Sequence, residues 1–315
     1  MPPTISVLMP VYNVERYIRE AMDGVLEQTY RDFEVVVVDD CSTDRTPSII
    51  EEYAGHDRRV RLVRTPRNLG HTGALNQGLD ECRGALVARM DGDDIMQPDR
   101  LAHQAAYLDD HPECAALGTQ VDFIDADGDL LVHFERPLEH DEIDRRLLRG
   151  DCLAIVHPSV MYRREAVISV GKYDPSLQKG EDHDLFLRLA ERARLANLPD
   201  TLLKFRRHHT STTALSSGEA MMERTRQTIR RALVRRGMPA DSIETDSFPQ
   251  APTRAEWHAQ WAFSIYKRKG DSRVARKHAL RALRHGPLNR RALRAFVYVF
   301  LGRTAGDLLR IGWRK

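Results

Sequence analysis

The stretch Phe33-Glu-Val-Val-Val-Val-Asp-Asp-Cys-Ser-Thr-Asp44 carries four consecutive valines that lead directly into an acidic turn. An unbroken β-branched run of this kind is typical of a strand that is buried on both faces. Short apolar runs also occur at 5–9, 60–63 and 86–90, and segments with helical spacing follow the first three strands at 14–28, 46–54 and 74–82. This alternation with short links predicts an α/β fold with a parallel sheet.

Polar residues follow three of these strands at the point where each strand ends. They are Tyr12 after the first strand, Asp40 after the second, and the cluster Asp91 to Asp94 after the fourth. Ligands of such sheets bind beyond the carboxyl ends of the strands. We therefore expect these three polar sites to converge on one edge of the sheet.

The composition indicates a globular protein with an uneven charge distribution. The chain has 315 residues, of which 42% are hydrophobic and 30% charged, and its net charge is +2. Residues 220–315 carry +15, which leaves −13 for residues 1–219. A basic C-terminal part on an acidic body suggests an anionic partner for that part, or a solvated helical face.

Cysteine usage and hydropathy bear on the cellular location. The four cysteines form no CxxC or CxxH pair, which argues against a zinc site and against a disulfide framework. No charged segment and apolar core resembling a secretory signal opens the chain, and no run of about 18 apolar residues occurs. We expect a cytoplasmic protein without a membrane-spanning helix.

Asp91-Gly92-Asp93 is the motif with the clearest chemistry. Two carboxylates separated by a small residue at a strand end suit a hard divalent cation, and Gly92 would let a diphosphate approach the backbone. A magnesium or manganese ion held there would offset the charge that develops on a departing nucleoside diphosphate. Alone, the motif is equally typical of an acidic loop or a helix cap.

The full set of motifs, in order, resembles the family 2 glycosyltransferases of GT-A fold over residues 4–212. The segments that carry the resemblance are Pro10-Val-Tyr-Asn13, Val38-Asp-Asp-Cys-Ser-Thr-Asp44, Asn68-Leu-Gly70, Ala74-Leu-Asn76, Met90-Asp-Gly-Asp-Asp94 and Gly180-Glu-Asp-His-Asp184. The resemblance implies a nucleotide-sugar-binding, Rossmann-like domain that transfers one sugar to an acceptor hydroxyl.

The resemblance also implies roles in donor binding. Tyr12 would stack on the base, Asp40 would accept a hydrogen bond from it, and uridine is the favoured base. Asp93 would bind the cation (Mn²⁺ or Mg²⁺), helped by Asp91 and by His208, which follows Phe205 and Arg206 as in the family's closing segment. The residues that would contact the donor are Pro10, Tyr12, Asn13, Asp40, Asn68, Asn76, Asp91 and Gly92. Asn76 and His208 have equally good structural interpretations.

On the acceptor side, the resemblance makes Asp182 the general base of an inverting displacement. Glu181 would help to bind the acceptor, would be the base itself, or would cap the following helix together with Asp182. His157 would contact the sugar or phosphate, or serve as a structural histidine.

The Gln-x-x-Arg-Trp pentad of processive members is absent, which favours a single transfer. Leu75 stands where many relatives have arginine, and Arg67 or Arg206 could supply the missing cation.

The C-terminal third has a helical pattern throughout. Helices are predicted at 219–236, 254–268, 271–285 and 288–312, with a linker at 240–253. We therefore divide the chain into a GT-A catalytic domain, 1–215, and a basic helical region, 219–315.

In 290–315, arginines flank an apolar and aromatic stripe. This pattern is typical of a helix that lies on an anionic membrane, or of a helix that packs on its neighbours or on a second subunit. No nucleic-acid-binding motif accompanies these arginines.

Together these features predict an inverting, metal-dependent glycosyltransferase that acts on a glycan or lipid-linked saccharide, either in the cytoplasm or peripherally on the membrane. A nucleotidyltransferase is the first alternative, but it would need a Gly-rich, cationic loop after the first strand, where this chain reads Pro10-Val-Tyr-Asn13. A catalytically inactive sugar-nucleotide sensor is the second alternative, and the retained Asp91, Asp93 and Asp182 count against it.

Overall fold

The computed structural model describes residues 3–208, 218–240, 242 and 252–312; the side chains of 218–220 and 303–312 lie outside that description. Contacts group the chain into two compact units. The first contains Met1–Val121, Phe134–Phe205 and Glu219–Phe248, and the second contains Asp122–His133, Arg206–Gly218 and Pro249–Lys315. The functional division expected at 215 and 219 stays a prediction.

The strands of the described chain form one sheet in the order β3-β2-β1-β4-β8-β6-β9-β5, with β7 paired to β6. Strand β1 pairs in parallel with β2 and β4, and β2 with β3, which confirms the predicted α/β fold with a parallel sheet. Strand β8 runs antiparallel between β4 and β6. The strands are β1 Ile5–Val11, β2 Phe33–Asp39, β3 Val60–Arg64, β4 Leu86–Arg89, β5 Ile95–Met96, β6 Cys114–Ile124, β7 Leu130–Phe134, β8 Met161–Arg163 and β9 Arg194–Arg206.

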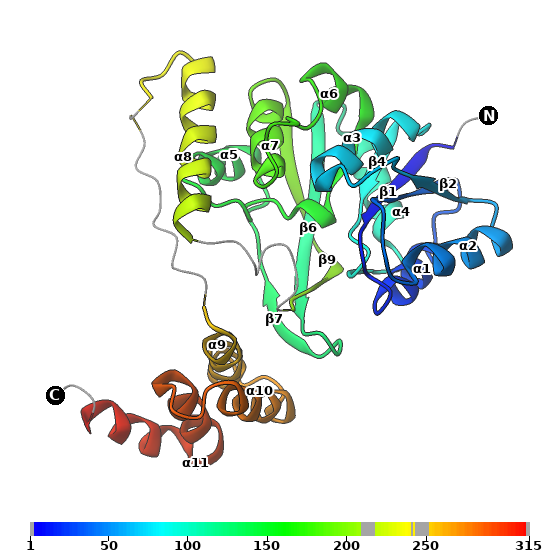
Figure 1. Ribbon diagram of the computed structural model, residues 1–315. Coiled ribbons are helices and arrows are strands. Elements are labelled where there is room, and N and C mark those ends of the chain that lie inside the picture. Colours follow the sequence, from blue (N-terminus) through cyan, green and yellow to red (C-terminus); the bar gives the residue numbers. More distant parts are fainter. Residues whose placement is uncertain (1–2, 209–217, 241, 243–251, 313–315) are drawn as a thin grey trace. The chain divides into compact units, whose positions relative to one another are not determined.

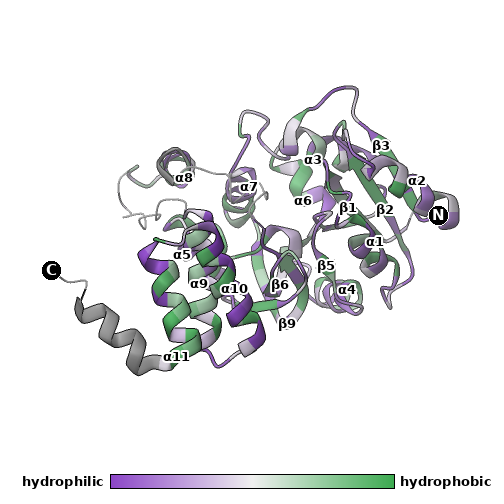
Figure 2. Cartoon of the chain, turned by 60° about the horizontal axis from the view of Figure 1, so that its bottom comes forward, coloured by the Kyte–Doolittle hydropathy of each residue, from purple (hydrophilic) through white to green (hydrophobic). Residues whose placement is uncertain are grey.

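Helices cover both faces of the parallel strands, so β1 and β2 are buried along their whole length (Figures 1 and 2). Helix α3 packs against the face that carries Leu8, Val36 and Val38. A Cβ added at Gly78 of α3 would overlap Leu8, so a small residue is needed where this helix approaches the sheet. The helices of the first unit are α1 Ile18–Leu26, α2 Thr46–His56, α3 Gly70–Glu81, α4 Arg100–Asp110, α5 His140–Leu148, η1 His157–Ser159, α6 Arg164–Ser169, α7 Glu181–Ala190 and α8 Gly218–Arg235.

A buried arginine fixes the carboxyl end of β4. Arg100, at the start of α4, is fully buried and donates hydrogen bonds to the carbonyl oxygens of Arg89 (2.9 Å) and Pro158 (2.8 Å). One turn later, Gln104 donates to the carbonyl oxygen of Ser159 (2.9 Å). These bonds satisfy backbone acceptors that would otherwise be buried without a partner. They hold the end of β4, and hence the acidic turn after it, against the η1 segment.

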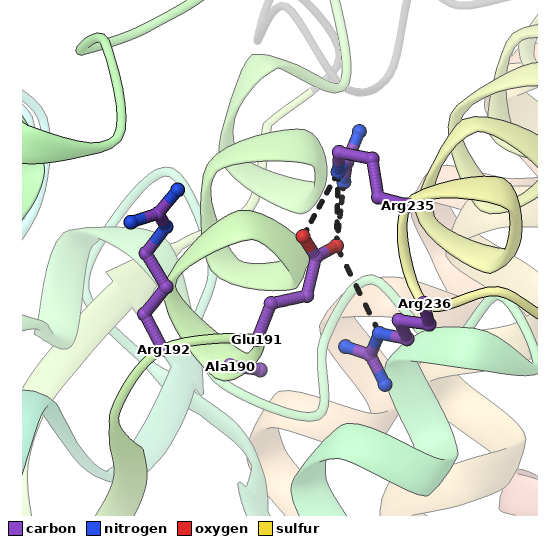
Figure 3. Close-up of a pocket in the computed structure, with 5 residues that line it drawn as sticks. All are labelled: Ala190, Glu191, Arg192, Arg235 and Arg236. Atoms are coloured by element: carbon purple, nitrogen blue, oxygen red, sulfur yellow. Dashed lines mark hydrogen bonds and ion pairs between the residues drawn. The ribbon is translucent and has the colours of Figure 1, made fainter.

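Helix α8 belongs to the first unit, because Ile229 and Leu233 join its hydrophobic core. A surface pocket lies beside this contact, and Figure 3 shows the ion pairs that line it. Glu191 accepts hydrogen bonds from Arg235 (2.8 Å) and lies 3.8 Å from Arg236. No predicted site residue lines this pocket, and its opposite charges already satisfy one another.

The second unit is built on three helices, α9 Arg254–Lys267, α10 Ser272–His285 and α11 Arg290–Gly312. Their shared core consists of alanines, which allow the helices to approach closely. The turn before β7 packs on α10, where Asp125 accepts a hydrogen bond from the buried His278 (3.2 Å) and pairs with Lys277. Helix α11 is interrupted at Gly302, whose φ is 85°.

Within the described residues, none of the helices combines the length and the apolar character needed to cross a bilayer.

Candidate active site

Two loops at the carboxyl ends of β1 and β2 are joined by hydrogen bonds. Asn13, in the left-handed region with φ 53°, donates from its backbone to Ser42 Oγ (3.0 Å), and its side chain accepts from Thr43 N (2.8 Å). Pro10 is buried within β1. Tyr12 lies in the loop after β1, and 49% of its surface is exposed. The Tyr12 ring is therefore accessible for stacking, while Pro10 and Asn13 shape the loop.

Asp40 is buried and holds the next loop in place. Its Oδ1 accepts hydrogen bonds from Leu69 N (2.7 Å) and Thr65 Oγ1 (3.0 Å). Asn68 donates from Nδ2 to the carbonyl oxygen of Asp40 (3.0 Å), and its Oδ1 accepts from Gly70 N (3.1 Å). The side chains of Asp40 and Asn68 thus organise the wall at the end of β2. Their contacts with a donor stay predictions.

Asn76 has a clear structural role. Its Nδ2 donates to the carbonyl oxygen of Tyr173 (2.8 Å), and its Oδ1 accepts from Tyr173 N (3.1 Å). The Tyr173 hydroxyl in turn lies 2.7 Å from Nε2 of the buried His157. Asn76 therefore joins α3 to the segment that precedes α7, and a donor contact for it stays a prediction.

The acidic turn after β4 brings three carboxylates together. Oxygen atoms of Asp91, Asp93 and Asp94 all lie within 4.8 Å of one another, an arrangement that can hold a metal ion. Gly92 is required here by packing, because a Cβ at this position would lie 2.7 Å from Val11 Cγ1. The contacts thus give a packing reason for this glycine, and the approach of a diphosphate to its backbone stays a prediction.

Arg89 is a charged site residue that the sequence analysis missed. Its side chain is almost completely buried at the end of β4, where Nη1 lies 2.6 Å from Asp91 Oδ2. Nη2 lies 2.9 Å from Nε2 of His71. Burial alone would lower the pKa of Arg89, but the charge and the hydrogen bond of Asp91 outweigh it and raise the pKa. The available signal was one arginine inside the apolar run 86–90, immediately before the acidic motif.

The same contacts continue to the first turn of α7. His71 Nε2 lies 3.7 Å from Glu181 Oε1, so Asp91, Arg89, His71 and Glu181 form a continuous chain of polar side chains. We call these four residues the Arg89 chain. Asp182 follows directly, and its Oδ1 accepts a hydrogen bond from His183 N (2.8 Å). The Arg89 chain therefore brings the two acidic motifs, 91 residues apart in sequence, to one side of the molecule.

Burial sets the protonation of this chain. It raises the pKa of Glu181 to about 8, with a further increase from the neighbouring Asp182, and it also raises the pKa of Asp182. Burial and then the charge of Arg89 lower the pKa of His71 to about 4. His71 is therefore neutral at physiological pH and can accept the hydrogen bond from Arg89. The Glu181 carboxyl group remains largely protonated at pH 7.

A second group of residues has the spacing of a metal site. Ligand atoms of His71, His157 and Glu181 lie within 4.8 Å of one another. However, Arg89 Nη2 lies 2.9 Å from His71 Nε2, so a cation bound there would lie against a buried guanidinium. Arg89 Nη1 likewise contacts Asp91 Oδ2 (2.6 Å) in the acidic turn, but the turn offers three carboxylates and no imidazole, so it is the better site for a hard cation.

The other predicted residues are described by their own surroundings. His208 is buried and belongs to the second unit, and its role as a metal ligand stays a prediction. Arg206, of the same unit, donates to the carbonyl oxygen of Asp125 (3.2 Å), and Arg67 is exposed. Leu75 is part of the hydrophobic core. The cation found beside the acidic turn is Arg89.

The chain is similar to known glycosyltransferases in sequence and in fold. The O-antigen biosynthesis glycosyltransferase WbnJ of Escherichia coli is 30% identical over 215 residues, which cover 66% of this chain and 81% of WbnJ. Residues 1–349 of Staphylococcus aureus TarS, solved with UDP-GlcNAc, share the fold with a TM-score of 0.62 at 20% identity, over 99% of this chain and 92% of that TarS chain.

A second similar structure is the mannosyltransferase PcManGT of Pyrobaculum calidifontis, solved with GDP-Man and Mn²⁺. Its TM-score is 0.54 at 18% identity, over 100% of this chain and 89% of PcManGT. The model of the family described as "Glycosyl transferase family 2" matches residues 6–171, which is more than half of the chain. The protein therefore belongs to glycosyltransferase family 2 and is a transferase of GT-A fold.

Proposed function

We propose that this glycosyltransferase moves one sugar from a nucleoside-diphosphate sugar to an acceptor hydroxyl with inversion, using a divalent cation and Asp182 as general base. The observation that carries the proposal is the Arg89 chain, which connects the Asp91 carboxylate to Glu181 through contacts of 2.6, 2.9 and 3.7 Å. A leaving group and a base must lie on opposite sides of one anomeric carbon, so the two acidic motifs must be neighbours.

The acidic turn fits the proposed cation. Asp91, Asp93 and Asp94 present hard oxygen ligands of the kind that Mg²⁺ and Mn²⁺ prefer, and Asp91 is held in position by Arg89. When bound, the cation would neutralise charge that develops on the departing diphosphate. Arg89 itself is buried and paired with Asp91, so its part is to orient that carboxylate. The Mn²⁺ in the PcManGT structure supports the metal requirement.

Asp182 is a better candidate for the base than Glu181. Asp182 is partly exposed, whereas Glu181 is buried, lies beside His71 and retains its proton to about pH 8. A base must reach the acceptor hydroxyl and be ionised when it does so. A protonated Glu181 would instead donate a hydrogen bond. Burial also raises the pKa of Asp182, but of the two side chains only Asp182 is partly exposed, so an acceptor hydroxyl could reach it.

For the donor, Tyr12 would stack on the base and Asp40 would bind it, beside the wall formed by Asn68 and Asn76. The UDP-GlcNAc in TarS supports a uridine donor. WbnJ supports a saccharide or lipid-linked acceptor in the synthesis of a surface polysaccharide. We further propose that the enzyme acts in the cytoplasm, in peripheral contact with the membrane.

Replacing Asp182 by Asn should lower kcat by about 10²–10⁴-fold, because the acceptor proton loses its base. Asn can still accept the hydrogen bond from His183 N, so the fold should persist. Release of nucleoside diphosphate in the presence of acceptor measures the effect, and a thermal shift with donor and Mn²⁺ checks that donor binding is retained. Glu181→Gln is the matched control; a larger loss with this variant than with Asp182→Asn would reassign the base.

Replacing Arg89 by Met should weaken donor binding in the presence of metal and destabilise the fold by about 1–3 kcal/mol, because the partly exposed Asp91 loses its charged partner. Titration of the folded variant with donor and Mn²⁺ measures the first effect, and urea unfolding measures the second. The control is Arg163→Met, which removes a partly buried arginine that donates to the carbonyl oxygen of Cys114 (3.0 Å). Equal donor affinity in both variants would contradict the role of Arg89.

The pKa of Glu181 predicts a pH-dependent stability. Its pKa rises from about 4.3 in the unfolded chain to about 8 in the fold, so the folded state holds the proton through that range. The free energy of unfolding therefore falls as pH rises from about 4.3 to about 8, by at most about 1.4 kcal/mol per pH unit. Residue 181 cannot ionise in Glu181→Gln. The free energy of unfolding of this variant, measured with urea in the absence of donor, should therefore increase relative to that of the wild type between pH 5 and 8. Parallel curves for the two proteins would refute the assignment.

A further inference from the structure

Helices α10 and α11 contain a long cationic segment without acidic residues. Between Asp271 and Asp307 the sequence has nine arginines and lysines and no Asp or Glu. Some of these cations are already paired within the second unit, such as Arg281 with Asp127 (2.8 Å) and Arg291 with Glu256 (3.3 Å). Arg276 and Arg284 are exposed, and among the described residues no carboxylate pairs with either.

Exposed apolar side chains accompany these two arginines. Leu280 is 53% exposed and lies between Arg276 and Arg284 at a spacing of four residues, so the three share one face of α10. The Arg276 guanidinium lies 5.8 Å from the ring centre of Phe300, which places the end of the regular part of α11 beside this stripe. We add to this stripe the exposed Leu288, in the turn after α10, and Leu301, which follows Phe300 in sequence, and use the name cationic face for the set Arg276, Leu280, Arg284, Leu288, Phe300 and Leu301.

The apolar exposure on this face is concentrated. Four of the nine large apolar side chains that are exposed in the described part of the chain belong to it, and Leu288, in the turn between the helices, is 89% exposed. Leu301 is 67% exposed. Single exposed leucines are ordinary, but a cluster that includes unpaired arginines is typical of a binding surface.

We propose that the cationic face docks on an anionic lipid bilayer, with its leucines and Phe300 in the interfacial region and its arginines at the lipid phosphates. Arginine beside exposed leucine and phenylalanine is the composition of a helix that lies in a membrane interface. A second copy of the chain is a poor partner, because the same positive charges would face each other. The proposal extends the peripheral membrane contact that forms part of the proposed function.

Vesicle flotation of the full chain tests the proposal. The wild type should float with phosphatidylcholine vesicles that contain phosphatidylglycerol, and not with phosphatidylcholine alone. Arg276→Glu combined with Arg284→Glu should weaken binding to the anionic vesicles at least about tenfold, because each cation contributes to the attraction and each glutamate opposes it. Leu280→Ser combined with Leu288→Ser should also weaken binding, through the loss of apolar insertion.

The matched control is Arg31→Glu combined with Arg58→Glu, which makes the same change in net charge at exposed arginines of the first unit. If this control binds the anionic vesicles as well as the wild type does, the result supports docking through the cationic face. If both charge variants lose vesicle binding equally, the result overturns the proposal. No flotation of the wild type, or self-association in light scattering that the variants abolish, would also overturn it. Nucleoside-diphosphate release with a soluble acceptor should be unchanged in all variants, so this assay tests the transfer reaction separately.

Discussion

A buried arginine beside a carboxylate is the interaction on which the site depends. Removing a guanidinium from water is costly, so Arg89 is stable at the end of β4 only with charged and polar partners around it. Asp91 supplies the opposite charge at 2.6 Å, and His71 accepts a hydrogen bond on the other side. The need to satisfy one cation therefore brings together the acidic turn, the start of α3 and, through Glu181, the start of α7.

The parallel sheet provides the place for these contacts. Because β1, β2 and β4 run in parallel, the loops that carry Tyr12, Asp40 and Asp91 all leave the same edge. Arg100 then fixes the end of β4 by hydrogen bonds to buried carbonyl oxygens. Activity in such a fold resides in the loops, while the strands and their apolar helices hold those loops at fixed positions.

The sequence predicted the fold class and the four strands and three helices of residues 5–90, because apolar runs and helical spacing are local signals; the strands β5 to β9 were not predicted. The four C-terminal helices were also predicted, although the kink at Gly302 was not, and the expected linker at 240–253 lies mostly outside the described residues. Arg89 and His71 were missed because their partners are remote in sequence. Asn76 illustrates the same limit: its residue type allows a donor contact, but only the fold shows that both of its polar groups bind Tyr173. Burial, and hence the raised pKa of Glu181, is likewise a property of the folded chain.

In the proposed mechanism, the acidic turn and the first turn of α7 act on one anomeric carbon from opposite sides. A crystal structure of the full chain with Mn²⁺ and a non-hydrolysable UDP-sugar analogue tests this most directly. We expect the metal and the diphosphate on Asp91 and Asp93, with the Asp182 carboxylate facing the anomeric carbon opposite the phosphate. A diphosphate bound away from the acidic turn, or Asp182 on the same side as the leaving group, would refute the proposed mechanism.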